Sequence, residues 1–300
     1  MPSFEIVGRS GRARRGVLRL AHGQVETPVF MPVGTQASVK TVRNSDLERE
    51  RFGIILANTY HLYLRPGAET IEKCGGLHRF MSWNGNILTD SGGFQLFSLS
   101  KLRKRSEEGY RFQSHIDGSS HLLTPEKVIE IQKTLGSDVM MVLDECLEQP
   151  SGRDKTEESL ALTLRWAERA RRAYTGGEQA LFGIVQGGCF PDLREKSAME
   201  LASMGFDGYA IGGVSVGESR RNMMKAVRAC IPHLPEEKPR YLMGVGKPED
   251  LVDFVAQGVD MFDCVVPTRN ARGGGFFVPG GHINIRNARF RTDSLPVQPG

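Results

Sequence analysis

Closely spaced cysteines and long apolar stretches are both missing from this sequence. Its five cysteines, at positions 74, 146, 189, 230 and 264, form no Cys-x-x-Cys pair, so their spacing predicts neither a zinc clip nor a disulfide framework. No apolar run reaches the roughly 18 residues that a membrane-spanning helix needs. The N-terminus lacks the basic-then-apolar pattern of a secretion signal. We therefore expect a protein of the cytoplasm with no membrane span.

A large excess of one charge is also missing. The 39 basic and 35 acidic residues leave a net charge of +4, which is a weak indication of a polyanionic partner. Many of the arginines and lysines gather in three runs, at residues 9–19, 101–105 and 269–291. Solvated loops are the simpler interpretation of any single run. Three runs together favour a nucleic-acid surface without establishing it.

Eight short apolar runs recur along the chain, and polar residues or glycine follow them. Such continuous runs are typical of parallel strands that are buried on both faces. They span residues 29–33, 54–57, 87–89, 139–143, 181–185, 208–211, 241–243 and 261–264. Helical spacing separates most of them, most clearly at residues 156–174, 192–204, 218–230 and 248–257. This alternation predicts an α/β protein with a (β/α)8 barrel, and an open doubly wound sheet is the alternative.

Three other segments have the pattern and the turn residues of β-hairpins. They pair residues 4–7 with 17–20, 111–116 with 121–123, and 276–278 with 283–285. We expect them to decorate the barrel. No linker, repeat or low-complexity tract divides the sequence, so residues 1–300 are predicted to form a single domain.

Three of the predicted strands end in an aspartate: Asp90, Asp144 and Asp263. In α/β barrels the active site gathers at the C-terminal ends of the strands. A carboxylate beside a buried strand is costly unless it is paired, hydrogen-bonded or functional. A helix cap or a satisfied loop residue is an equally good interpretation of each aspartate alone. Three of them at one barrel mouth favour catalysis.

Paired carboxylates that face a sugar suit retaining glycosyl transfer. One attacks the anomeric carbon and forms a covalent intermediate, and the other handles the proton of the leaving or incoming group. Gln186 and the amides of Gly212 and Gly213 follow other predicted strands and are candidate donors to a base carbonyl. Asp144 is a candidate acceptor for the N1–H and the exocyclic amine of a guanine.

Six segments then resemble tRNA-guanine transglycosylases of the bacterial type. They are residues 56–62 (LANTYHL), 90–95 (DSGGFQ), 144–146 (DEC), 185–188 (VQGG), 241–246 (YLMGVG) and 261–269 (MFDCVVPTR). The resemblance follows the family's order and implies a (β/α)8 barrel. It implies that guanine at the wobble position of tRNAs with a G-U-N anticodon is exchanged for a 7-deazaguanine, in queuosine biosynthesis. Recognition of an unstacked anticodon base suits such a reaction.

The resemblance also implies roles for individual residues. Asp263 is expected to attack C1′ of the ribose, and Asp90 to take the proton from the incoming base. The expected base-binding residues are Ser91, Gly92, Gly93, Phe94, Asp144, Gln186, Gly212, Gly213 and Met243. The expected RNA-binding residues are Gly244, Val245, Gly246, Lys247, Pro248, Glu249 and Asp250 at the backbone, and Thr268, Arg269, Asn270, Ala271 and Arg272 at the flanking bases.

Residues 214–218 resemble the bacterial form of the base pocket. The eukaryotic form has a glycine where Val216 stands, which makes room for the bulkier queuine. A valine therefore implies the smaller 7-aminomethyl-7-deazaguanine, preQ1, as the incoming base. The resemblance implies no cofactor for the chemistry.

One feature of the family is absent from the 300 residues. Its members bind structural zinc through a Cys-x-Cys-x-x-Cys cluster and a later histidine, which follow the last strand and precede a closing helix. This sequence has no such cluster, and Cys264 belongs to the last predicted strand, so no metal ligand is assigned. We expect the chain to be C-terminally incomplete, without the last helix and the zinc subdomain. The full-length form is expected to be a homodimer.

Other functions stay open at this point. A non-catalytic subunit of a heteromeric transglycosylase would lack the paired aspartates, whereas both Asp90 and Asp263 are present. An inactive fragment is a related possibility. A small-molecule barrel enzyme, such as a glycoside hydrolase, would not explain residues 268–272. It would also not explain Asp144 and Gln186, whose acceptor and donor groups complement those of guanine.

Overall fold

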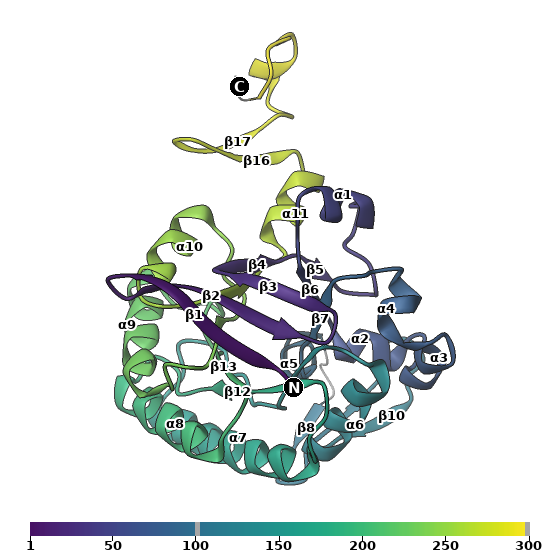
Figure 1. Cartoon of the computed structure of the whole chain (residues 1–300), viewed down its shortest axis with the longest axis vertical. Coiled ribbons are helices and arrows are strands. Elements are labelled where there is room, and N and C mark those ends of the chain that lie inside the picture. The colour runs from purple at the N-terminus through teal and green to yellow at the C-terminus, as the bar shows by residue number, and fades with distance from the viewer. Residues whose placement is uncertain (100–102, 298–300) are drawn as a thin grey trace.

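The computed structural model describes residues 1–99 and 103–297, and its centre is a parallel barrel (Figure 1). The barrel strands are β4 (Val29–Met31), β5 (Val33–Gly34), β6 (Ile54–Ala57), β7 (Asn86–Thr89), β11 (Val139–Met141), β12 (Ala180–Val185), β13 (Gly208–Ile211), β14 (Arg240–Leu242) and β15 (Met261–Asp263). Nearly all of their side chains are buried, as expected of strands that are covered on both faces.

The sheet closes on itself. Its hydrogen-bonded order is β4-β15-β14-β13-β12-β11-β7-β6-β5. β4 and β5 are separated only by Pro32, so the two ends of this order belong to one chain segment. Proline has no N–H to donate, which suits an interruption of the ladder at that residue. The predicted (β/α)8 barrel is confirmed, and the open-sheet alternative is wrong.

Helices alternate with the strands and form the outer layer (Figure 1). They are α1 (Asn44–Arg49), α2 (Thr59–Leu64), α3 (Ala68–Lys73), α4 (Gly76–Met81), α5 (Gly93–Leu99), α6 (Pro125–Leu135), α7 (Arg153–Ala173), α8 (Pro191–Met204), α9 (Arg220–Cys230), α10 (Pro248–Val255) and α11 (Val266–Arg272), with 3-10 turns η1 (Ile231–His233) and η2 (Ala288–Phe290). The four predicted helices are confirmed as α7 to α10. Within the described residues, no helix has the length and apolar character needed to cross a membrane.

Short antiparallel sheets decorate the barrel, as predicted. β1 (Ser3–Ser10) and β2 (Ala13–Leu20) form the first hairpin, and β3 (Gly23–Thr27), which the sequence analysis missed, extends it. β8 (Arg103–Arg105), β9 (Tyr110–Gln113) and β10 (Ser120–Leu123) form the second sheet. β16 (Gly275–Val278) and β17 (Gly281–Asn284) form the last hairpin, which projects away from the barrel (Figure 1).

The sheet β1–β3 lies across the end of the barrel where the strands begin, which we call the floor. The guanidinium of Arg14 is buried there and donates to Asp260, which directly precedes β15. Its terminal nitrogens donate to the backbone oxygens of Glu236 and Lys238, just before β14. The arginine run at residues 9–19 therefore contributes structural contacts.

The run at residues 101–105 has a similar use where it is described. Arg105 donates to both carboxylate oxygens of Glu145 at 2.8 Å, and Arg103 donates to the backbone oxygen of Leu96. Lys101 lies outside the described residues. The third basic run extends from α11 past the projecting hairpin, and its arginines at positions 269, 272, 286, 289 and 291 make no ion pair among the described residues.

Candidate active site

The three predicted carboxylates line one cavity at the C-terminal ends of the strands. Its volume is about 430 Å³, and Asp90, Asp144 and Asp263 all contribute to its wall. Asp90 follows β7, Asp144 follows β11, and Asp263 ends β15, so the carboxylates come from three separate strands. The barrel mouth brings them together as expected.

Asp90 is buried and held only by neutral donors. The side-chain amide of Asn58 donates to Oδ2 at 2.6 Å, and the backbone N–H of Thr59 donates to Oδ1 at 2.9 Å. Burial raises the pKa of Asp90 to about 6, and the nearby charge of Asp263 acts in the same direction. These hydrogen bonds oppose the shift but do not cancel it. Asp90 is therefore able to exchange a proton near neutral pH.

Asp263 has one fixed carboxylate oxygen. The phenol of Tyr241 donates to Oδ1 at 2.6 Å, and the backbone N–H of Gly244 donates to the same oxygen at 2.8 Å. Oδ2 has no hydrogen-bond partner among the residues that the structure describes. Burial raises the pKa of Asp263, while the bonds from Tyr241 and Gly244 favour its ionised form. The result is an oriented carboxylate with one oxygen available for bonding.

Asp144 is joined to two other predicted base-binding residues. The side-chain amide of Gln186 donates to Oδ2 at 2.6 Å, and the hydroxyl of Ser91 lies 3.4 Å from Oδ1. Burial raises the pKa of Asp144 to about 6. Gly93 packs so closely that an added side-chain carbon would lie 2.9 Å from Oδ1 of Asp144. The site thus requires a residue without a side chain at position 93.

The loop after β13 forms the part of the cavity wall next to Gln186. Gly212 and Gly213 line it together with Met243. A side-chain carbon at Gly212 would lie 2.7 Å from Ile184, and one at Gly213 would lie 2.2 Å from Oε1 of Gln186. Gly213 also has a φ of +61°, which favours glycine. Glycine at both positions therefore leaves the backbone itself exposed to the cavity.

Phe94 and Gly92 complete the predicted base-binding set. Phe94 lines the cavity and is 48% exposed, so its aromatic side chain is available for stacking. Gly92 has a φ of +83° at the start of α5 and packs against Tyr60. Every predicted base-binding residue thus lies on the cavity wall or directly behind it.

The predicted RNA-binding residues fall into two groups. The first surrounds a neighbouring cavity of about 510 Å³, lined by Gly244, Val245, Gly246, Lys247, Glu249 and Asp250. Lys247, Pro248 and Glu249 are exposed, whereas Val245 and Asp250 are buried, and Asp250 accepts from Arg220 at 2.6 Å.

The second group, residues 268–272, belongs to α11. Arg269 is exposed and also lines the main cavity, and Arg272 is exposed on the same short helix. Thr268 donates to the backbone oxygen of Val265 at 3.2 Å. The exposed arginines therefore lie beside the cavity that holds the carboxylates.

Comparison with known proteins identifies the family. The sequence model described as queuine tRNA-ribosyltransferase matches residues 9–300. The chain belongs to the queuine tRNA-ribosyltransferase family.

Individual relatives agree with the family model. The chain is 58% identical to the queuine tRNA-ribosyltransferase of Solidesulfovibrio magneticus over 299 residues, which are 99% of this chain and 80% of the relative. It is 55% identical to the same enzyme of Acinetobacter baylyi, over 99% of this chain and 78% of the relative. The corresponding protein of Halothermothrix orenii is 54% identical, over 99% and 80%. The predicted resemblance is thereby confirmed at the level of the family.

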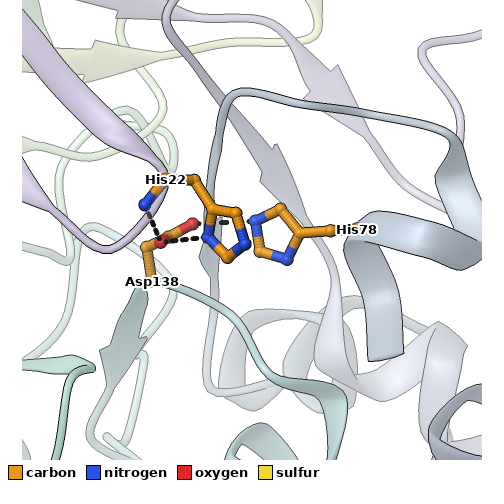
Figure 2. Close-up of side chains that lie close together, drawn as sticks. All are labelled: His22, His78 and Asp138. Carbon is orange, nitrogen blue, oxygen red and sulfur yellow. Dashed lines mark hydrogen bonds and ion pairs between the residues drawn. The ribbon is translucent and has the colours of Figure 1, made fainter. Parts of the chain in front are cut away.

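The zinc expected of queuine tRNA-ribosyltransferases does not fit the residues described here. The five cysteines lie apart, and none belongs to a group of potential metal ligands within the described residues. A group of this kind occurs instead at the barrel floor, where His22, His78 and Asp138 lie together (Figure 2). It joins the turn between β2 and β3, helix α4, and the residue that precedes β11.

The geometry of this floor cluster indicates hydrogen bonding rather than metal binding. Nδ1 of His22 lies 2.7 Å from Oδ1 of Asp138, and Nε2 of His78 lies 2.9 Å from Oδ2. The two rings stack with centroids 3.6 Å apart and planes only 17° from parallel. A metal ion must lie near the plane of each ligating imidazole, and two nearly parallel stacked planes do not meet at such an ion. Figure 2 shows both rings directed at the carboxylate.

Three residues of this site received no role from the sequence. Asn58 and Tyr241 stand inside the family motifs, but only the structure shows that they bond to Asp90 and Asp263. Arg194 on α8 lies behind the cavity wall and is fully buried. Its signal in the sequence is a charged residue on the apolar face of a predicted helix, with Ser197, Ala198 and Leu201.

Proposed function

We propose that this chain is a tRNA-guanine transglycosylase that replaces guanine at the wobble position of G-U-N anticodons with preQ1. Membership of the queuine tRNA-ribosyltransferase family supports a ribosyl transfer to tRNA in queuosine biosynthesis. The observation that carries the proposal is the pair of carboxylates in one cavity. Oδ2 of Asp263 accepts no hydrogen bond from the described part of the chain, and Asp90 has a pKa of about 6.

The first step is a displacement at the ribose. Oδ2 of Asp263 attacks C1′, the bond from C1′ to N9 of guanine breaks, and its electron pair leaves with the base. Tyr241 and the Gly244 N–H hold the other oxygen, so Asp263 need not reorient before it attacks. Asp90 supplies the proton that the departing guanine takes up.

The second step reverses the first with a different base. PreQ1 enters, Asp90 accepts the proton from its N9, and N9 attacks C1′ to release Asp263. Asp144 accepts from N1–H and the exocyclic amine, while Gln186 and the amides near Gly213 donate to the base carbonyl. Phe94 and Met243 lie against the faces of the base. Two displacements retain the configuration at C1′.

Several finer features belong to the same proposal. Val216 lines the cavity and limits its size, which supports preQ1 as the incoming base. Lys247 and its neighbours would contact the RNA backbone, and Arg269 with Arg272 would contact the bases beside the wobble position. We further propose a cytoplasmic location and a homodimer, and no cofactor takes part in the steps above.

Guanine incorporation tests the proposal. The protein is incubated with radiolabelled guanine and tRNA that has a G-U-N anticodon, with a tRNA that has adenine at the wobble position as the control. Label is expected only in the first RNA. Binding of that RNA without incorporation would instead support a non-catalytic subunit.

A denaturing gel tests the nucleophile separately. The wild-type protein is expected to form a covalent RNA adduct, and Asp263→Ala is expected to abolish it. An adduct that persists in this variant would show that another residue attacks the ribose.

A further inference from the structure

Arg194 is a buried cation whose partners are backbone carbonyls. Nε donates to Gly188 at 2.8 Å, and Nη1 donates to Val185 at 3.0 Å and to Gly212 at 2.7 Å. Nη2 donates to Gly213 at 3.1 Å. A buried charge without a carboxylate partner is costly, and burial lowers the pKa of Arg194. The planar guanidinium fork is the side chain that can satisfy four carbonyls at once.

Two of these carbonyls belong to the wall of the base cavity. The Gly212 carbonyl shares its peptide unit with the N–H of Gly213, and the Gly213 carbonyl shares its unit with the N–H of Val214. Both peptide bonds are trans, so each N–H points opposite to its carbonyl. Because both carbonyls face Arg194, both N–H groups face away from it. Gly213 and Val214 line the cavity.

Those two N–H groups have no hydrogen-bond acceptor among the described residues. An unpaired backbone N–H in a buried position is unusual in a folded protein, and Val214 is only 4% exposed. A ligand oxygen in the cavity would satisfy them. The six-membered ring of guanine and of its 7-deaza analogues offers such an oxygen in its carbonyl group.

We infer that Arg194 is a positioning residue that aims the N–H groups of Gly213 and Val214 at the carbonyl oxygen of the bound base. This inference rests on the proposed function for the identity of the base. Arg194 does not touch the base itself. It fixes the two peptide units from behind, and hydrogen bonds to their carbonyls also make the N–H groups stronger donors.

Substitution by lysine gives the first test. Arg194→Lys keeps a positive charge but loses the fork, so the two peptide units are free to reorient. We expect KM for guanine to rise about tenfold, the equivalent of roughly one lost hydrogen bond, with KM for tRNA unchanged. The matched control is Arg14→Lys at the barrel floor, which also replaces a buried arginine. It is expected to lower the melting temperature without moving KM for guanine. If Arg194→Lys behaves like this control, Arg194 has only a structural role and the inference is wrong.

A base analogue makes the test specific to the carbonyl. 6-Thioguanine keeps the N1–H and the exocyclic amine of guanine but replaces the 6-oxygen by sulfur, a weaker hydrogen-bond acceptor, and calorimetry measures its binding in the absence of tRNA. The wild type is expected to bind it about tenfold more weakly than guanine, and Arg194→Lys is expected to lose most of this preference. Full preference in the folded variant would overturn the inference.

A measurement on the wild type covers the case in which Arg194→Lys does not fold. At saturating base, guanine is expected to shift the amide resonances of Gly213 and Val214 in ¹⁵N-labelled protein, and 6-thioguanine is expected to shift them clearly less. Equal shifts with both bases would overturn the inference. The proposed function fails separately, if the wild type shows these binding signatures but transfers no guanine into tRNA.

Discussion

The two ends of the barrel hold their buried aspartates in opposite ways. At the floor, Asp138 is bonded to His22 and His78, and Asp260 is bonded to Arg14. Each of these floor carboxylates thus has an arginine or histidine side chain as a partner. At the mouth, the donors to Asp90, Asp144 and Asp263 are side-chain amides, hydroxyls and backbone N–H groups.

The pKa values reflect this difference. Burial acts to raise the pKa of Asp138, but hydrogen bonds from His78, His22 and the Ile87 N–H together hold it below its ordinary value. Burial raises the pKa of Asp90 and of Asp144 to about 6. Burial also raises the pKa of Asp260, although Arg14 acts in the opposite direction. The contrast with the mouth is therefore clearest for Asp138. Carboxylates at the mouth remain free to react because their charge is not neutralised, and this costs stability.

The largest expected effect is a loss of guanine exchange that occurs in a variant of the mouth and not in a variant of the floor. Asp263→Asn keeps an oxygen for Tyr241 and Gly244 to donate to, so the site should keep its shape, but an amide does not attack C1′. Guanine exchange should fall by at least about 10⁴-fold, as for other lost nucleophiles. The floor counterpart Asp138→Asn should keep its rate per folded molecule. A comparable loss in both variants would mean that activity depends on general integrity rather than on the mouth.

The same floor variant should show the next largest effect, on stability. Asp138→Asn replaces one acceptor oxygen by an N–H₂ group, so donors among His22, His78 and the Ile87 N–H lose their acceptor. We expect the free energy of unfolding to fall by about 3 kcal/mol at pH 7, measured by urea denaturation. His22→Ala, at the exposed edge of the cluster, should cost less. An unchanged midpoint in Asp138→Asn would contradict the structural role of the floor.

The barrel and its carboxylates were predictable because both leave a local pattern. Apolar runs that end in aspartate reveal buried parallel strands and their C-terminal ends. β3 was missed because Gly23–Thr27 is mostly polar and exposed, and only its pairing with β2 makes it a strand. Predicted ends of elements also differed by a few residues, since the sequence does not show where hydrogen bonding stops.

The electrostatic partners could not be predicted in the same way. Arg14 and Asp260 are 246 residues apart, and His22 and Asp138 are 116 apart. No local spacing connects such pairs, so the arginine run at residues 9–19 suggested a nucleic-acid surface. Arg194 is an intermediate case. Its position on the same helix face as Ala198 and Leu201 indicates burial, but its four carbonyl partners depend on how two loops fold over it.

A smaller effect is expected on the pH dependence of base binding. Asp144 must be ionised to accept two N–H bonds from guanine, and its pKa is about 6. The ionised fraction is therefore high at pH 7.5 and falls as the pH drops below about 6, so guanine affinity should decrease by up to about tenfold per pH unit there. Calorimetry between pH 5 and 8 measures this without tRNA. A constant affinity for guanine down to pH 5 would mean that burial does not raise the pKa of Asp144.

The smallest effect is a gain in stability at the mouth. Burial raises the pKa of Asp90 from an ordinary 3.8 to about 6, so its favourable contribution exists at low pH and is lost as the pH rises through 6. At pH 7 the folded protein holds a poorly compensated charge, and Asp90→Asn should raise the free energy of unfolding by about 1 kcal/mol while abolishing exchange. The gain should shrink as the pH falls toward 4, because the wild-type carboxyl is then neutral in the folded state and increasingly so in the unfolded state. Urea denaturation at pH 7 and pH 5 measures both values. If Asp90→Asn is instead destabilised at pH 7, as Asp138→Asn should be, then the bonds from Asn58 and Thr59 outweigh burial, and the mouth and the floor hold their aspartates by the same means.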